Sequence, residues 1–187
     1  MRERLLKQAS HEYSPKQRAA LLAVAGVVFL VILPWVLVRL GGRLDRARGW
    51  PASALRTSGV SYPPVNAILG GLMALTGWLL AVWSIYVQFT LGRGTPVPVM
   101  ATQELIVRPP YSYCRNPMAL GAIVLYLGVS VAAGSLGAAL IVLLGAAALL
   151  TYIKVVEERE MVARFGEAYL AYRRRVLSLI PRLRRRG

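Results

Sequence analysis

One octapeptide, 114-CRNPMALG-121, carries groups that could bind a ligand at the start of a long apolar run. Asn is a favoured N-cap and Pro suits the first helical position, so Asn116 and Pro117 indicate a helix start. The N–H groups of a helix start favour an anion, and Arg115 adds positive charge beside them. The octapeptide is therefore either the start of a membrane helix alone or half of a binding site.

The apolar run that follows must fold back on itself. Residues 116–153 contain no charged side chain. As one helix they would reach about 57 Å, whereas the apolar core of a bilayer is only about 30 Å thick. Gly134 and Ser135 in the middle of the run indicate a tight turn. We therefore expect a hairpin of two helices, at about 116–133 and 137–158.

The hairpin returns two adjacent carboxylates, Glu157 and Glu158, to the octapeptide. Residues equally far from the turn lie at equal depth, which places the carboxylates one or two residues beyond the level of Arg115. Both signs of charge then meet at the helix start at Asn116, which suits a zwitterion such as an amino acid head group. The alternative is a solvated helix end in which Lys154 pairs with Glu158.

The rest of the chain supplies two further spans. The protein has 187 residues and is 56% hydrophobic, and residues 19–38 and 65–91 also lack charged side chains. A membrane helix needs about 20 apolar residues, so each run predicts one span. The sequence thus predicts an all-α membrane protein of about four transmembrane helices. We expect two parts: residues 1–91, with a basic lead and two helices, and residues 92–187, with the loop, the hairpin and the candidate site.

Helical periodicity between residues 157 and 181 predicts a C-terminal amphipathic helix. Apolar residues recur three or four positions apart, as on one face of a helix: Met161, Phe165, Tyr169, Tyr172, Val176 and Leu179. Most charged residues lie off this stripe, so we expect the helix to lie flat on the cytoplasmic membrane surface. Gly166 is expected only to weaken it slightly.

Basic residues are distributed unevenly between the two sides. Of the 23 Lys and Arg residues, 18 lie in segments 1–18, 92–115 and 154–187. The positive-inside rule then places both termini and the candidate site in the cytoplasm. The tail 182–186 is expected to contact anionic lipid headgroups. The formal charge of +15 does not indicate nucleic acid, because no aromatic-studded basic module accompanies it.

The chain has one cysteine, Cys114, and one histidine, His11. They cannot form an intramolecular disulfide or a Cys/His zinc cluster, and we expect no metal site. A Cys-His or Ser-His-Asp nucleophile is also disfavoured, because His11 lies in the N-terminal lead. Cys114 is expected to be a small packing residue, and the chemistry must use carboxylates, Arg, Tyr, Asn and backbone groups.

At these residues the chain resembles the integral-membrane methyltransferases of the isoprenylcysteine carboxyl methyltransferase and phospholipid methyltransferase superfamily. The signature of that superfamily is Arg-His-Pro-x-Tyr, a helical hairpin, then a hydrophobic residue and Glu-Glu. This chain has 115-RNPMA-119 and 156-VEE-158, and around them 92-GRGTPVP-98, 107-VRPPYSYCRNPMALG-121 and 165-FGEAYLAYRRRV-176. The likeness covers residues 92–181.

The resemblance implies S-adenosylmethionine (SAM) as the methyl donor, bound at the cytoplasmic end of the hairpin. It assigns to the cofactor site Arg115, Asn116, Pro117, Gly121, Glu157 and Glu158, with Tyr111 and Tyr113 against the adenine. Glu157 or Glu158 would bind the methionine ammonium, and Asn116 would help with the carboxylate or ribose. The expected catalytic residues are Arg115, Glu158 and Arg173, the last either steadying an anionic acceptor or binding the lipid surface.

Two positions depart from the family signature. Asn116 replaces its His, which removes proton transfer and keeps hydrogen bonding. Ala119 replaces its Tyr, so the contact of that phenol is absent or comes from Tyr126 or Tyr113. The resemblance leaves the acceptor open among a phospholipid amine, a prenylated cysteine carboxylate and a small hydrophobic thiol or acid.

A different class of function is a non-catalytic membrane protein, either a small transporter subunit or an assembly scaffold. Transporters usually carry ionisable groups inside their spans. The three apolar runs of this chain have none, which favours the methyltransferase.

Overall fold

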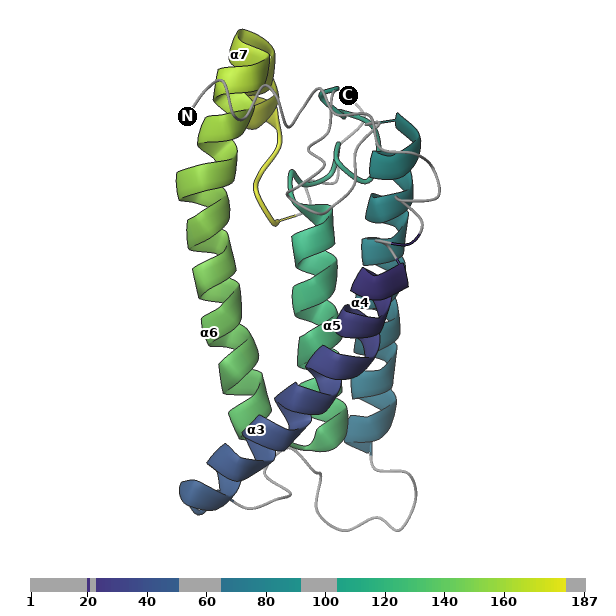
Figure 1. Cartoon of the computed structure of the whole chain (residues 1–187), viewed down its shortest axis with the longest axis vertical. Coiled ribbons are helices and arrows are strands. Elements are labelled where there is room, and N and C mark those ends of the chain that lie inside the picture. The colour runs from purple at the N-terminus through teal and green to yellow at the C-terminus, as the bar shows by residue number, and fades with distance from the viewer. Residues whose placement is uncertain (1–19, 21–22, 51–64, 92–103, 181–187) are drawn as a thin grey trace.

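The structure is a computed structural model that describes residues 20, 23–50, 65–91 and 104–180. The basic lead, the segment 92–98 and the tail 182–186 lie outside these residues. Within the described part all regular secondary structure is helical (Figure 1). The elements in chain order are the π-helical turn η1 (Val28–Ile32), α3 (Leu33–Ala47), α4 (Val65–Leu91), α5 (Pro117–Ala133), α6 (Leu136–Tyr152), the π-helical turn η2 (Ile153–Glu157) and α7 (Glu158–Arg175).

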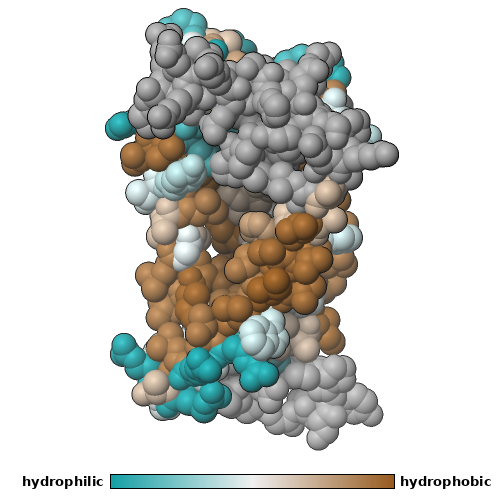
Figure 2. Space-filling model, viewed as in Figure 1, coloured by the Kyte–Doolittle hydropathy of each residue, from teal (hydrophilic) through white to brown (hydrophobic). Residues whose placement is uncertain are grey.

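Three of the described helices are long and apolar enough to cross a membrane: Ala23–Ala47, Val65–Leu91 and Leu136–Arg175. Figure 2 shows their apolar side chains as a belt over the middle of the molecule, with hydrophilic residues below and above it. The prediction of an all-α membrane protein is confirmed. α5 is apolar but shorter, at 17 residues, so the count of four spans stays a prediction.

The hairpin forms where the sequence predicts it. α5 ends at Ala133 and α6 begins at Leu136. Gly134 between them adopts the left-handed conformation, with φ of 66°, which a glycine adopts without steric cost. The hydroxyl of Ser135 accepts a hydrogen bond from the N–H of Ala138 and so caps α6.

α4 and α5 form the most extensive helix pair (Figure 1). Glycines recur seven positions apart on both helices, as Gly70 and Gly77 on α4 and as Gly121 and Gly128 on α5. A Cβ added to Gly121 would lie 2.7 Å from the carbonyl oxygen of Gly77, and one on Gly128 would lie 2.6 Å from that of Gly70. Lipid offers no hydrophobic drive for association, so membrane helices use such small residues to bring backbones into contact.

α3 extends further than the sequence indicated. The charge-free run ends at residue 38, but the helix continues to Ala47. Gly41 lies against α6, where a Cβ on it would approach the Cβ of Ala138 to 2.6 Å. The charge-free run therefore underestimates the length of this helix, because packing against α6 stabilises residues 41–47 as helix.

Asp45 near the end of α3 binds the hairpin turn. Its Oδ2 accepts a hydrogen bond of 2.6 Å from the Ser135 hydroxyl, and its Oδ1 accepts one of 2.6 Å from the Gly137 N–H. The side chain is buried, at 6% exposed. A carboxylate at the start of α6 is stabilised by the helix dipole, and it ties α3 to the hairpin. No sequence signal pointed to Asp45.

We expect Asp45→Ala to lower the free energy of unfolding by about 2–3 kcal/mol, since hydrogen bonds to a buried charged group are the strong ones. Asp45→Asn should cost less, because its amide oxygen can still accept from Gly137. Thermal unfolding of the purified protein in detergent, followed by circular dichroism, measures both. Equal stability of Asp45→Ala and the wild type would show that this cap contributes nothing.

α7 is not one flat helix. Gly166 has φ of 51° and ψ of −130°, and the helix breaks there. Such a conformation is open essentially to glycine alone, so the expectation that Gly166 only weakens the helix is wrong. Beyond it, the apolar stripe forms a buried cluster of Tyr169, Tyr172 and Val176, which packs on Leu105. The predicted stripe is present, but this part of it faces the protein's own loop.

Candidate active site

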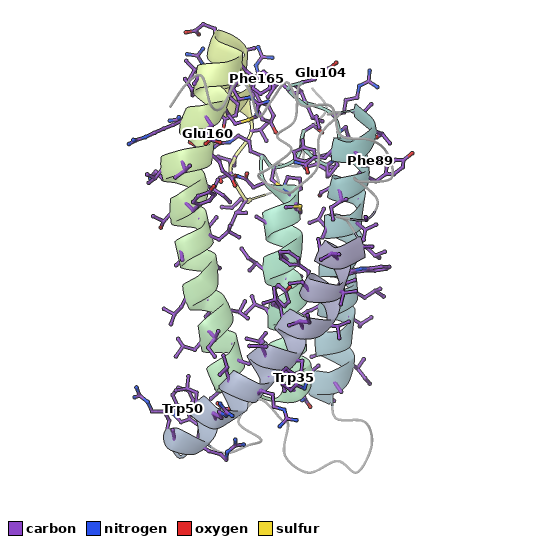
Figure 3. All side chains as sticks on the ribbon, viewed as in Figure 1. Trp35, Trp50, Phe89, Glu104, Glu160 and Phe165 are labelled. Carbon is purple, nitrogen blue, oxygen red and sulfur yellow. The ribbon has the colours of Figure 1, made fainter. Side chains whose placement is uncertain are left out.

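The first residue of α7 forms a buried ion pair with the residue just before the N-cap of α5. Arg115 Nη1 lies 2.6 Å from Glu158 Oε1, and each side chain is only 11% exposed. The hairpin geometry predicts that both carboxylates return to the level of Arg115, and the structure places Glu158 there. The alternative of a solvated helix end is therefore wrong for Glu158. Figure 3 places the labelled Glu160 and Phe165 of α7 at the same end of the molecule as Glu104, opposite Trp50.

Two residues from beyond the Gly166 break complete a charged network around this pair. Arg173 Nη1 lies 3.4 Å from Glu158 Oε2, so both oxygens of the carboxylate face an arginine. Arg115 Nη1 also donates to the hydroxyl of Tyr169, at 3.1 Å. Sequence periodicity identified Tyr169 as part of the stripe but gave no reason to place it beside Arg115.

The start of α5 is held by the segment that follows α7. The backbone N–H of Arg115 donates to the Leu177 carbonyl at 2.8 Å, and that of Asn116 donates to the Ser178 carbonyl at 3.0 Å. The Asn116 amide group donates to Ser178 Oγ at 2.9 Å. α5 does begin at Pro117, but the Asn116 side chain makes no capping bond to its own helix. Ser178 carried no recognisable sequence signal.

The two tyrosines assigned to the adenine differ in their surroundings. Tyr111 is buried, and its hydroxyl donates to the Ser84 carbonyl of α4 at 3.4 Å. Burial, and the nearby Tyr172, raise the pKa of Tyr111 above its ordinary value, so its phenol stays neutral. Tyr113 is 39% exposed and makes an edge contact with Trp83. Contact of either ring with a cofactor stays a prediction, and Tyr113 is the more accessible.

Three more residues have roles within the protein itself. Two belong to the expected cofactor site, and the third, Tyr126, is a candidate to replace the missing signature tyrosine. Pro117 is fully buried, and Gly121 lies in the contact between α5 and α4. The Tyr126 hydroxyl donates to the Phe29 carbonyl at 2.8 Å, in the π-helical turn η1. A cofactor role for Pro117 and Gly121 stays a prediction.

Two groups of opposite sign beside the ion pair lack partners. Arg115 Nε is buried with no hydrogen-bond acceptor in the described part of the chain. Glu157 is half-buried and forms no ion pair within 4.0 Å with any described residue. Buried polar groups are normally satisfied, so Arg115 Nε is an exception among the described residues.

Cys114 lies directly before this network and is 2% exposed. Its role as a small packing residue is confirmed. Burial raises the pKa of the Cys114 thiol, which lowers the fraction of reactive thiolate.

We expect Cys114 in the folded protein to react with a polar maleimide at least tenfold more slowly than after denaturation, because both exposure and thiolate fraction are low. Mass spectrometry of labelled protein over time provides the two rates. Rapid labelling of the folded protein would contradict the packing around Cys114.

Comparison with known proteins identifies the family. The model of the phospholipid methyltransferase family matches residues 65–168, more than half of the chain. The chain belongs to the phospholipid methyltransferase family. The match runs from the start of α4 to the first part of α7, and it includes Arg115 and Glu158.

One curated relative of this protein is methanethiol S-methyltransferase 2 of Bradyrhizobium diazoefficiens. The two are 32% identical over an alignment of 118 residues that covers 57% of this chain and 43% of the relative. The chain thus matches less than half the length of that relative. No solved structure gives a significant match.

Proposed function

We propose that this protein is a SAM-dependent methyltransferase embedded in the membrane, with its site on the cytoplasmic side. The acceptor is lipid-like, either an isoprenylcysteine-type carboxylate or a phospholipid amine. The observation that carries this proposal is the buried Arg115–Glu158 pair, flanked by an unsatisfied arginine N–H and an unpaired carboxylate. Membership of the methyltransferase family supports it.

The unsatisfied groups fit the amino acid end of SAM. Its ammonium would bind Glu157, which is half-buried and free of arginines in the described part. Its carboxylate would bind Arg115 Nε, a buried donor that lacks an acceptor there. Glu158 is assigned a different task, because Arg115 and Arg173 already occupy both of its oxygens. It holds the two arginines in place.

The chemistry needs little from the side chains beyond position. When bound, SAM would supply a methyl group on a sulfonium sulfur, for transfer to a lone pair of the acceptor with the sulfur as leaving group. The protein aligns the two reactants and excludes water, which accounts for most of the acceleration in such a transfer. Arg173 is 48% exposed at the edge of the network and would steady an anionic acceptor. Asn116 keeps the helix start in place through Ser178.

The test is incubation of the purified protein in detergent with methyl-labelled SAM and a membrane lipid extract. The expected result is label in a lipid fraction, separable by chromatography. Label in no fraction, together with no measurable SAM binding, would favour a non-catalytic membrane protein and overturn the proposal.

The name of the curated relative favours a second acceptor class, a small thiol. The same incubation with methanethiol in place of lipid tests it. Labelled dimethyl sulfide without labelled lipid would assign the protein to small-thiol methylation and reject the lipid acceptor.

A further inference from the structure

An open cavity of about 310 Å³ lies against the outer side of the Arg115–Glu158 pair. Its lining residues are Lys154, Glu158, Arg159, Val162 and Arg173. Lys154 of η2 and Glu158, Arg159 and Val162 of α7 supply one wall. Arg173 comes from beyond the Gly166 break and closes the opposite side. We call this space the basic cavity.

The basic cavity has an excess of positive charge. Among the described residues, Glu158 is its only acidic lining residue, and that carboxylate is already paired with Arg115 and Arg173. Neither Lys154 nor Arg159 forms an ion pair within 4.0 Å in the described part of the chain. Cations that line one cavity repel one another, and a bound anion would relieve that repulsion.

The basic cavity also lies where the apolar part of the protein ends. Lys154 is the first charged residue after the uncharged stretch 116–153. A cation at the end of a membrane helix is at the level of the lipid headgroups. An anion at this level is most readily a lipid phosphate.

We infer that the basic cavity binds the phosphate of an anionic membrane lipid that is held beside the site. This inference does not depend on the proposed function, since it rests on Lys154, Arg159 and Arg173 around a neutralised carboxylate. Each surface Lys or Arg contributes about 1 kcal/mol to binding an anionic headgroup, or roughly fivefold in affinity. Removing two should weaken binding by roughly 20-fold.

The experiment compares thermal unfolding in neutral detergent with added phosphatidylglycerol, phosphatidylcholine or soluble glycerol phosphate. The test variant is Lys154→Gln with Arg159→Gln. The matched control is Arg174→Gln with Arg175→Gln, which removes two neighbouring exposed arginines outside the cavity. We expect phosphatidylglycerol alone to stabilise the wild type and the control, with a half-saturating amount roughly 20-fold higher for the test variant.

Equal stabilisation of the test variant and the control by phosphatidylglycerol would overturn the site. If phosphatidylcholine stabilised the wild type as much as phosphatidylglycerol does, binding would not require an anionic lipid and the inference would be wrong. Stabilisation by glycerol phosphate as strong as by the lipid would overturn the assignment to a membrane lipid. SAM binding is measured in parallel, and its absence would contradict the proposed function while leaving these outcomes unaffected.

A second inference comes from the π-helical turn η2, which decides which of the adjacent carboxylates faces Arg115. Val142 and Ile153 are both buried, and eleven residues separate them by about three α-helical turns, so they share one face. Glu158 is five residues after Ile153. In a regular α-helix it would lie about 140° from that face, and Glu157 would lie closest to it.

In η2 the N–H of Glu158 donates to the carbonyl of Ile153 instead. The turn thus contains one residue more than an α-helical turn, and Glu158 comes onto the buried face where Arg115 lies. The geometry points to η2 as the positioning element that presents Glu158 to Arg115 and leaves Glu157 for a ligand.

Because η2 contains one extra residue, we expect a deletion and an insertion at the exposed Val155 to have different effects. Deletion of Val155 converts η2 into an α-helical turn and keeps Glu158 on the buried face. Insertion of an alanine after Val155 moves Glu158 away from that face. Arg115→Met and Glu158→Gln, alone and together in each background, measure the coupling between the two side chains by thermal unfolding.

We expect the coupling to persist in the deletion background and to disappear in the insertion background. Loss of coupling in the deletion background, or its survival in the insertion background, would overturn the role of η2. If the deletion variant does not fold, Val155→Gly serves as a second variant, because it loosens the turn without changing the register. A weaker coupling with Val155→Gly supports the inference, and an unchanged coupling contradicts it.

Discussion

Glu158→Gln is expected to weaken SAM binding by at least 100-fold and to destabilise the protein. The variant keeps the shape of the side chain but leaves Arg115 as a buried charge without its partner at 2.6 Å. Breaking one side of a buried ion pair costs about 3–5 kcal/mol, because the remaining charge is uncompensated. The displaced Arg115 can then no longer present Nε to the ligand. Calorimetric titration of SAM in detergent measures the affinity, and thermal unfolding measures the stability.

Two matched variants separate the contributions. Glu167→Gln removes a carboxylate of α7 that is 85% exposed and lies 3.9 Å from Arg174, and it should change neither quantity. Glu157→Gln should weaken SAM binding without lowering the unfolding temperature, because Glu157 has no ion pair to lose among the described residues. SAM affinity that is unchanged in both Glu157→Gln and Glu158→Gln would refute the assigned site.

Gly77→Ala is expected to destabilise the protein by about 2–3 kcal/mol, the upper range for adding a group to a packed interface. The new Cβ would lie 2.5 Å from the carbonyl oxygen of Gly121, closer than any tolerable contact. The atoms in the way are backbone, so α4 and α5 must separate and lose contact along their length. Thermal unfolding in detergent, followed by circular dichroism, measures this loss.

Gly71→Ala is the control on the same helix. A Cβ on Gly71 meets nothing within 4 Å, so the alanine should stabilise the helix by about 0.5–1 kcal/mol through its better helix propensity. The two glycines are six residues apart, and their substitutions should therefore have opposite signs. The same sign and size for both would show that the contact between α4 and α5 does not depend on glycine.

The hairpin and the return of its two carboxylates to Arg115 could be predicted because they depend on local signals. An uncharged run too long for one span must turn, and Gly134 and Ser135 mark where. Two arms of similar length then return to the same depth, which brings the Glu157–Glu158 pair to the level of Arg115. An error of one helical turn in the length of either hairpin helix would still leave these side chains within reach of each other, since they are long.

Features that need a second element as partner could not be predicted. The α3 helix continues past its apolar run because Gly41 and Asp45 meet α6 and the hairpin turn. Nothing in the sequence around Asp45 distinguishes it from a solvated loop residue. The stripe through Tyr169 looked like a lipid-facing surface, because periodicity shows that a face is apolar and not what covers it.

The sequence by itself determined the membrane class, the turn of the hairpin and the meeting of Arg115 with the Glu157–Glu158 pair, since these follow from charge, length and chain order. Only the tertiary structure decided which carboxylate pairs with Arg115 and which stays free. That choice depends on the extra residue in η2, and the approach of Arg173 depends on the break at Gly166. Both are backbone conformations that packing selects, and side-chain periodicity does not record them.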